Sequence, residues 1–318
     1  MKKPLIGLLV LGVLFSVFFF VQLRVVKNHQ NPVVAVLIPG SVEFFAVQRK
    51  GMDQAAREYG LNLIYADAEW EAAKQLSQVE HFISQGVDLI LICSVDNLAL
   101  QSAIPLVQRA KIPLITFSNT IGGDRHGHYK GVITHVGRDE VKGGGLLGQM
   151  VEQLFGDQAA RIVFIQGTPG TSAQRMREEG FEAVVKQHAN WKIVYNQYVS
   201  GWTKEGALNA MEDFLQTAKE ADIIVTQWWT ASVSAAMALR EKGTLGTKIV
   251  GLEFSGELAS YIRSKQVSSS TYFSIAEEGF KAVETAARFL KKEEVPQFVE
   301  IVPVWVTAEN VDRFQPEL

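Results

Sequence analysis

The feature of this sequence that most constrains its fold is an alternation of short apolar runs with segments of helical periodicity. Val33–Ile38 is the first such run, and apolar side chains then recur at helical spacing from Phe44 to Tyr59, where Gly60 follows. A continuous apolar run of about four to eight residues is typical of a parallel strand buried on both faces, and a glycine commonly ends a helix. Strands separated by helices predict right-handed βαβ units and parallel sheets.

The alternation occurs in two series, which predicts two doubly wound α/β lobes. Strands are expected over Val33–Ile38, Leu61–Ala66, Asp88–Cys93, Pro113–Phe117, Arg161–Gln166, Lys192–Val199, Asp222–Thr226, Lys248–Leu252, Val267–Tyr272 and Val299–Val306. Helices are expected over Phe44–Tyr59, Glu71–Gln85, Leu98–Ala110, Asp139–Phe155, Ala173–His188, Lys204–Ala218, Ala231–Lys242, Leu258–Ser264 and Ala276–Leu290. In open sheets of this kind ligands bind outside the carboxyl ends of the strands, so functional residues are sought there.

The N-terminal segment predicts export. Pro4–Leu23 carries no charge and lies between Lys2-Lys3 and Arg24, and its length matches the roughly 20 residues that span a bilayer as a helix. Because no A-x-A-like site follows it, an uncleaved signal anchor is favoured over a cleaved signal peptide. Residues 1–31 are thus expected to be an anchor or signal peptide with a short tether. The protein is expected to be periplasmic or extracytoplasmic, tethered to the cytoplasmic membrane by residues 4–23.

The composition argues against several functional classes. The net charge of −3, without a cluster of basic residues, gives no reason to expect nucleic acid. Cys93 is the only cysteine, which excludes an intramolecular disulfide. His126 and His128 have no third metal ligand close in the sequence, and Gly143–Gly145 lacks the strand–GxGxxG–helix context of a dinucleotide site. No catalytic constellation is evident, so we expect a binding protein and not an enzyme, with no cofactor and no metal.

Five phrases of the sequence resemble one known family. They occur in that family's order and spacing, and they are Phe44-Phe45, Pro113–Ser118, Asp139–Gly144, Ile165–Phe181 and Ile249–Glu253. On these phrases the chain resembles the periplasmic sugar-binding proteins of the ribose-binding, LacI-like type. The resemblance implies a type I periplasmic-binding fold, with two Rossmann-like lobes joined by a three-segment hinge. It implies a first lobe of 32–138 plus 274–301 and a second lobe of 139–273 plus 302–318.

The resemblance also implies a function. The expected activity is that of an extracytoplasmic solute-binding protein, which captures a sugar or sugar-like small molecule between two lobes and delivers it to an ABC importer. The alternative is a receptor that presents its ligand to a membrane sensor kinase or chemoreceptor. The expected partners are therefore the small-molecule ligand and either an ABC permease or a membrane sensor.

The family places aromatic side chains on both faces of the sugar ring. By this resemblance Phe44 and Phe45 would cover one face, although one of them is expected to pack in the core, and Trp202 would cover the other. Arg177 would point its planar guanidinium at ligand hydroxyls, the alternative being a surface salt bridge. Arg175, two residues earlier, is expected to face solvent.

The remaining expected contacts are Asn119 and Glu253, at strand ends where the family places hydroxyl-binding groups; loop capping is the alternative. This chain has Ser118-Asn119 where ribose-binding relatives carry Asp-Arg, and Trp228-Trp229 where they carry Asn-Asp. It has Glu253 where they carry Asp. Trp228 is therefore added to the expected ligand contacts. This exchange of polar groups for aromatic area suits a less hydroxylated, larger or cationic ligand, and makes ribose itself doubtful.

Overall fold

The first series of alternating segments forms a six-stranded sheet. The computed structural model describes residues 31–217, 219–244 and 246–318. Within them the first sheet is wholly parallel, in the order β11 (Phe298–Glu300), β5 (His135–Gly137), β4 (Leu114–Phe117), β3 (Leu89–Ile92), β1 (Val33–Ile38) and β2 (Asn62–Asp67). β3 and β4 are fully buried, as expected for strands covered on both faces.

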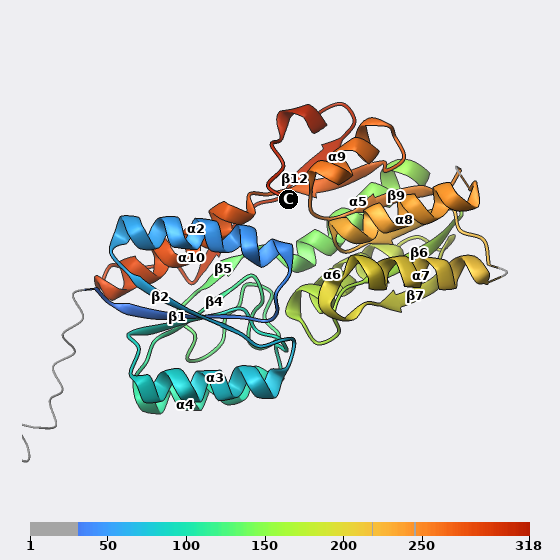
Figure 1. The fold of residues 1–318 in the computed structure, drawn as a ribbon. Helices are drawn as coiled ribbons and strands as arrows, with labels where there is room; N and C mark the ends of the chain where they lie inside the picture. Colours follow the sequence, from blue (N-terminus) through green and yellow to red (C-terminus); the bar gives the residue numbers. More distant parts are fainter. Residues whose placement is uncertain (1–30, 218, 245) are drawn as a thin grey trace, which may run out of the picture.

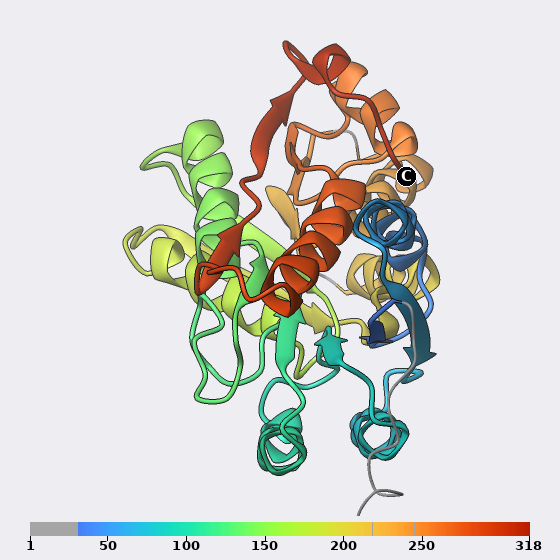
Figure 2. The same cartoon turned by 90° about the vertical axis from the view of Figure 1, so that its left-hand side faces the viewer.

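Helices cover both faces of this sheet and complete the first lobe (Figure 1). One face packs against α2 (Glu43–Tyr59) and α10 (Ile275–Leu290), and the other against α3 (Ala72–Gln85) and α4 (Ala103–Ala110). Figure 2 shows α2 beside α10, although the two are more than 200 residues apart in sequence. The first lobe is thus assembled from two segments that are far apart in the sequence.

The second series forms the second sheet and the second lobe. Its order is β12 (Val304–Thr307), β10 (Ser269–Tyr272), β9 (Lys248–Gly251), β8 (Ile223–Thr226), β6 (Ala160–Gln166) and β7 (Trp191–Tyr198). β12 runs antiparallel to β10, and the other pairs are parallel. One face carries α5 (Glu140–Phe155) and α6 (Ser172–Val185); the other carries α7 (Lys204–Gln216), α8 (Trp229–Lys242) and α9 (Gly256–Arg263). Three short 3₁₀ helices lie at Ala99–Ser102, Ser200–Trp202 and Val311–Arg313.

Two expectations about individual elements are wrong, and both errors involve proline. The segment expected as one helix, Leu98–Ala110, is a 3₁₀ turn followed by α4, with Pro105 in the first turn of α4. The segment expected as one strand, Val299–Val306, is split into β11 and β12, which belong to different sheets, and Pro303 lies between them. Proline has no N–H to donate to a helix or a ladder, so it separates elements that the apolar pattern joins.

β5 was not expected, because its three residues form too short a run to stand out from the surrounding loop. The other expected strands and helices are present, with ends shifted by a few residues. The expected membrane segment, Pro4–Leu23, lies outside the described residues. Among the helices that are described, none has both the length and the apolar character needed to cross a membrane.

Each lobe contains a pair of helices in very close contact, made possible by glycine. A Cβ added to Gly144 of α5 would lie 2.0 Å from the carbonyl oxygen of Arg177 on α6, and one added to Gly180 would lie 1.9 Å from that of Val141. Gly51 of α2 approaches the Ala276 carbonyl oxygen of α10 in the same way, at 1.8 Å. Gly144, the middle residue of the glycine run 143–145, therefore serves helix packing in this fold.

Candidate functional site

A cavity of about 370 Å³ lies between the two lobes, at the carboxyl ends of their strands. Its volume falls in the range of about 300–1,000 Å³ typical of small-molecule sites. Segments following β1, β2 and β4 line it from the first lobe, and segments following β6, β7, β8 and β9 line it from the second. All seven residues selected from the sequence line this one cavity: Phe44, Phe45, Asn119, Arg177, Trp202, Trp228 and Glu253.

Aromatic rings form the walls of the cavity in the second lobe. Trp202 and Trp228 meet edge to face, with ring centroids 5.4 Å apart. The Trp202 ring lies directly over Gly167, where an added Cβ would be 2.1 Å from the indole. Trp228 is 3% exposed and precedes α8. The two indoles thus fix each other's orientation at this end of the cavity.

In the first lobe Phe44 opens helix α2 and contacts Phe45 edge to face at 5.2 Å and Phe273 at 6.2 Å. Phe45 is the more buried of the two and belongs to the core of this lobe, while both line the cavity. The first lobe also contributes Trp70, which the sequence analysis missed. It follows β2 just as Trp202 follows β7, so the argument that selected an indole in a loop after a strand applies to both.

Five buried charged side chains form a continuous row beside the cavity. Arg138 bonds to Glu278 on α10 through Nη1 (2.9 Å) and to Glu140 on α5 through Nη2 (2.9 Å). Arg177 bonds to Glu140 through Nε (2.7 Å) and to Glu253 through Nη1 and Nη2 (both 3.3 Å). The row Glu278–Arg138–Glu140–Arg177–Glu253 thus alternates in sign and runs from the first lobe into the second.

Burial and pairing with arginine shift the pKa values of the carboxyl groups in this row in different directions. Burial tends to raise the pKa of Glu140, but the guanidinium groups of Arg177 and Arg138 outweigh it and hold that pKa below its ordinary value. Burial raises the pKa of Glu253 and of Glu278, and their arginine neighbours offset it only in part. Negative charge is therefore favoured in the middle of the row and disfavoured at its two ends.

Arg177 uses its whole guanidinium within the protein. Besides the four bonds to Glu140 and Glu253, its Nη1 donates to the carbonyl oxygen of Gln227. A guanidinium has five N–H groups, so none remains free for a ligand in this arrangement. Arg175 is exposed, as expected, whereas Arg177 is 2% exposed; its ion pairs are buried, so the surface salt bridge considered as its alternative role is wrong.

Asn119 makes contacts across the two lobes. Its Nδ2 donates to the Ser94 carbonyl oxygen (3.0 Å), and its Oδ1 accepts from the backbone N–H of Ala173 (3.3 Å) and the hydroxyl of Ser172 (3.4 Å). The Ser172 hydroxyl also accepts from the backbone N–H of Thr120 at 2.8 Å. These bonds join the end of β4 to the start of α6, so the structure is a closed one, with the lobes in contact beside the cavity.

Among the residues that line the cavity, two fully buried polar atoms have no hydrogen-bond partner in the described part of the chain. They are Nε1 of Trp228 and Oγ1 of Thr230, which lie on either side of the start of α8. Buried polar groups are nearly always paired, by protein, water or ligand. Thr230 was not selected from the sequence. Its position next to Trp228-Trp229, after a buried strand, was the sequence feature that could have identified it.

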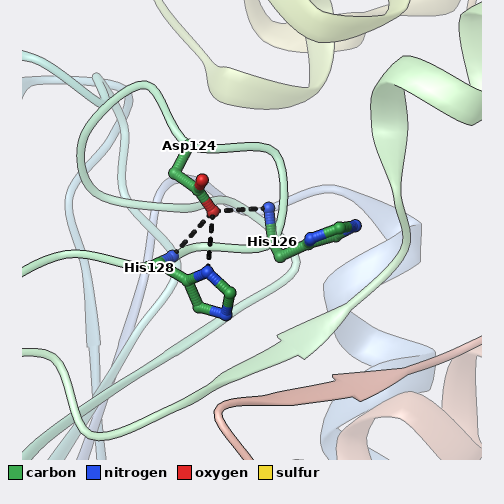
Figure 3. A group of neighbouring side chains, drawn as sticks. All are labelled: Asp124, His126 and His128. Carbon is green, nitrogen blue, oxygen red and sulfur yellow. Dashed lines mark hydrogen bonds and ion pairs between the residues drawn. The ribbon is translucent and has the colours of Figure 1, made fainter.

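A second cluster, away from the cavity, brings together possible metal ligands. Asp124, His126 and His128 each offer an atom within 4.8 Å of the others (Figure 3). The prediction that the two histidines have no third metal ligand close in the sequence is therefore wrong, because Asp124 lies only two residues before His126. Asp124 Oδ1 already accepts from the backbone N–H groups of His126 (2.9 Å) and His128 (3.0 Å), and Arg125 bonds to the neighbouring Asp139. We interpret the cluster as a turn in which the Asp124 carboxylate caps backbone N–H groups, next to the Arg125 guanidinium.

Comparison with known proteins gives consistent matches over most of the chain. The family described as periplasmic binding protein domain matches residues 34–294. The ribose import binding protein RbsB of Salmonella typhimurium is 27% identical over 252 residues, which are 79% of this chain and 82% of that protein. The family match spans all the residues that line the cavity.

Solved structures show the same fold. An ABC transporter solute-binding protein from Mycobacterium smegmatis with bound glycerol is 26% identical, with a TM-score of 0.80, covering 89% of this chain and 96% of that one. One from Bacillus halodurans with bound myo-inositol is 24% identical, with a TM-score of 0.82, covering 90% and 98%. The two lobes and their relative placement are thus those of known solute-binding proteins.

Proposed function

The chain belongs to the periplasmic binding protein domain family, and from this premise we propose that it captures a small sugar-like solute between its lobes and delivers it to an ABC importer. The observation that carries the proposal is the cavity of about 370 Å³ that both lobes line at their strand ends. Rings from both lobes offer flat apolar area, as the C–H face of a sugar or polyol requires. The ribose import binding protein (27% identity) and the solute-binding protein solved with bound glycerol (26%) are named for small hydroxylated solutes.

Within this proposal the seven selected residues take different roles. Trp202, Trp228 and Phe44 supply the apolar contact area, with Phe45 supporting Phe44 from the core. Glu253 presents its carboxylate to the ligand. Arg177 and Asn119 act chiefly by position. Arg177 donates to Glu253 and Glu140. Asn119 donates to the Ser94 carbonyl oxygen in its own lobe and accepts from the backbone N–H of Ala173 in the other.

The proposed lobe boundaries are 32–138 plus 274–301 and 139–273 plus 302–318. The chain passes between the sheets after β5, after β10 and after β11, which supports three hinge segments. Ligand binding in such an arrangement stabilises the closed form. Solution scattering should then give a smaller radius of gyration at saturating solute, and an unchanged radius would contradict hinge closure.

The importer role is tested by transport. A strain lacking this gene should lose uptake of the solute that the purified protein binds most tightly, and the wild-type gene should restore it. Normal uptake in the deletion strain would rule out an importer component.

The apolar segment Pro4–Leu23 favours a second candidate, a tethered receptor for a membrane sensor kinase or chemoreceptor. Cross-linking in intact membranes distinguishes the two, since an importer component should be captured with a permease and a receptor with a sensor. N-terminal sequencing that begins after residue 23 would show that the tether is removed.

A further inference from the structure

The buried charged row beside the cavity has a surplus of negative charge. It contains three carboxylates, Glu278, Glu140 and Glu253, against the two guanidinium groups of Arg138 and Arg177. Each arginine lies between two carboxylates, so the row begins and ends with a glutamate. An unpaired buried charge is costly, and the surplus therefore requires either a proton or a further cation.

The two ends of the row differ in what surrounds them. Glu278 is fully buried: its Oε2 accepts from both Arg138 (2.9 Å) and Gln48 (3.0 Å), and its Oε1 has no partner among the described residues, but it does not line the cavity. Glu253 instead lines the cavity. Its Oε1 accepts the two 3.3 Å bonds from Arg177, whereas its Oε2 accepts no hydrogen bond from any described residue. The open end of the row therefore offers an unsatisfied carboxylate oxygen next to the space for a ligand.

The backbone holds this carboxylate in place. Glu253 has a φ of +71°, a left-handed conformation uncommon for residues other than glycine. Its backbone N–H donates to Thr271 Oγ1 (3.1 Å), and its carbonyl oxygen accepts from the Ser270 hydroxyl. Both partners lie on β10, so the adjacent strand fixes an otherwise unfavourable turn whose side chain reaches the cavity. Backbone outliers of this kind concentrate at ligand sites.

Other charged groups at the cavity do not neutralise Glu253. Lys204 is paired with Glu257 through both carboxylate oxygens at 2.9 Å. Arg138 is held by Glu140 and Glu278, and the exposed Glu43 adds negative charge. The faces of aromatic rings also carry partial negative charge, which attracts cations.

We propose that the ligand is a small hydroxylated cation, an amine-bearing sugar or polyol, whose positive charge pairs with the Glu253 carboxylate among the aromatic rings of the cavity. This rests on the proposed solute-binding function and narrows its ligand class. The cation extends the alternation of the buried row by one positive charge. Trp228 and Thr230, whose Nε1 and Oγ1 atoms lack a partner among the described residues, also line the cavity, and the ligand hydroxyl groups are the partners that we expect for them. Burial raises the pKa of Glu253, so its charged form lacks a full counter-charge in the protein alone. A ligand cation supplies that counter-charge and forms a strong ion pair with the carboxylate.

Calorimetric titration of the full chain with matched pairs of solutes tests this proposal. Xylitol, D-glucose and myo-inositol are each compared with the counterpart in which one amino group replaces a hydroxyl. At pH 7 the tightest-binding amine should bind at least roughly tenfold more tightly than its neutral counterpart, the difference expected for a charge-assisted bond. Glu253→Gln should abolish this preference, which is measured as the ratio of the two affinities within each pair. Glu179→Gln, an exposed residue of α6 outside the cavity, is the control and should preserve the preference.

The outcomes separate the inference from the function on which it rests. If the neutral solutes bind as tightly as the amines, the ligand is not a cation. If the preference for amines survives Glu253→Gln, the cation does not pair with Glu253. Either result would overturn the inference and leave solute capture intact. Failure of every member of both sets to bind would count against the proposed function itself, and the cation would fall with it. Circular dichroism of Glu253→Gln should match the wild type, because the variant row balances two carboxylates against two guanidinium groups.

Discussion

The two lobes share one scaffold but present different chemistry to the cavity. Each has a six-stranded sheet and one pair of helices brought together by glycines, α2 with α10 and α5 with α6. The first lobe contributes Phe44 and Trp70, and Asn119, whose amide is already paired. The second lobe contributes the carboxylate oxygen of Glu253 and the polar atoms of Trp228 and Thr230, which have no partner.

This difference indicates a division of labour. Unsatisfied polar atoms specify a ligand, because leaving them unpaired in a closed site is costly. Paired polar groups and flat rings exclude water without demanding a particular partner. We therefore propose that the second lobe carries recognition and that the first lobe covers the ligand and completes the enclosure.

The largest effect is expected from Arg177, the residue that organises the polar side of the second lobe. Arg177→Ala leaves Glu140 and Glu253 buried with fewer partners, and breaking such a pair costs about 3–5 kcal/mol in the free energy of unfolding. Arg175→Ala, on the exposed face of α6, should change it by about 0.5 kcal/mol or less. Urea unfolding of both variants is the measurement. Equal effects would mean that the buried row contributes nothing particular to this lobe.

The next largest effect tests whether the two scaffolds are equivalent. Gly144→Ala and Gly51→Ala each place a methyl group against a backbone carbonyl of the partner helix and should each cost about 1–3 kcal/mol in stability. Gly145→Ala is the matched control, because an added Cβ there meets nothing within 4 Å, and it should stabilise α5 by about 0.5–1 kcal/mol. Thermal unfolding gives all three values, and a neutral result for one of the tight positions would break the equivalence.

The comparison between the lobes also predicts unequal losses of affinity. Trp202→Ala removes the indole that packs on Trp228 and lies 5.5 Å from the Arg177 guanidinium, and should weaken binding at least about tenfold, or about 1.4 kcal/mol. Phe44→Ala, in the covering lobe, should weaken it by less. Calorimetry with the tightest-binding solute measures both. A larger loss for Phe44→Ala would assign recognition to the first lobe instead.

The smallest expected effect concerns pH. Because the pKa of Glu253 is raised in the folded protein, this group contributes stability at low pH that is lost as the pH rises from the unfolded value, near 4.3, through the folded one. Glu253→Gln has no such loss, so the stability of the ligand-free variant relative to wild type should increase from pH 4 towards neutral pH. Urea unfolding at several pH values follows this difference. A difference that stays constant would contradict the raised pKa.

The scaffold was largely predictable from the sequence, because buried strands and amphipathic helices leave a local apolar pattern. The pattern failed at Pro105 and Pro303, where the missing N–H separated elements, and at the short β5. The candidate residues were found by resemblance and by their position at strand ends. Their hydrogen bonds and ion pairs were not predicted. The bond from Arg177 to Glu140 depends on the close approach of α5 and α6, and the two residues are 37 positions apart, so no local signal records it.

The cavity between the lobes as the solute site is the central claim, and native mass spectrometry tests it most directly. The full chain is purified without refolding and mixed with the polyols and their amine counterparts. We predict a noncovalent adduct of one small solute per chain, retained in Arg175→Ala and strongly reduced in Trp202→Ala. An adduct equally abundant in Trp202→Ala, or none with any of these solutes, would contradict the account.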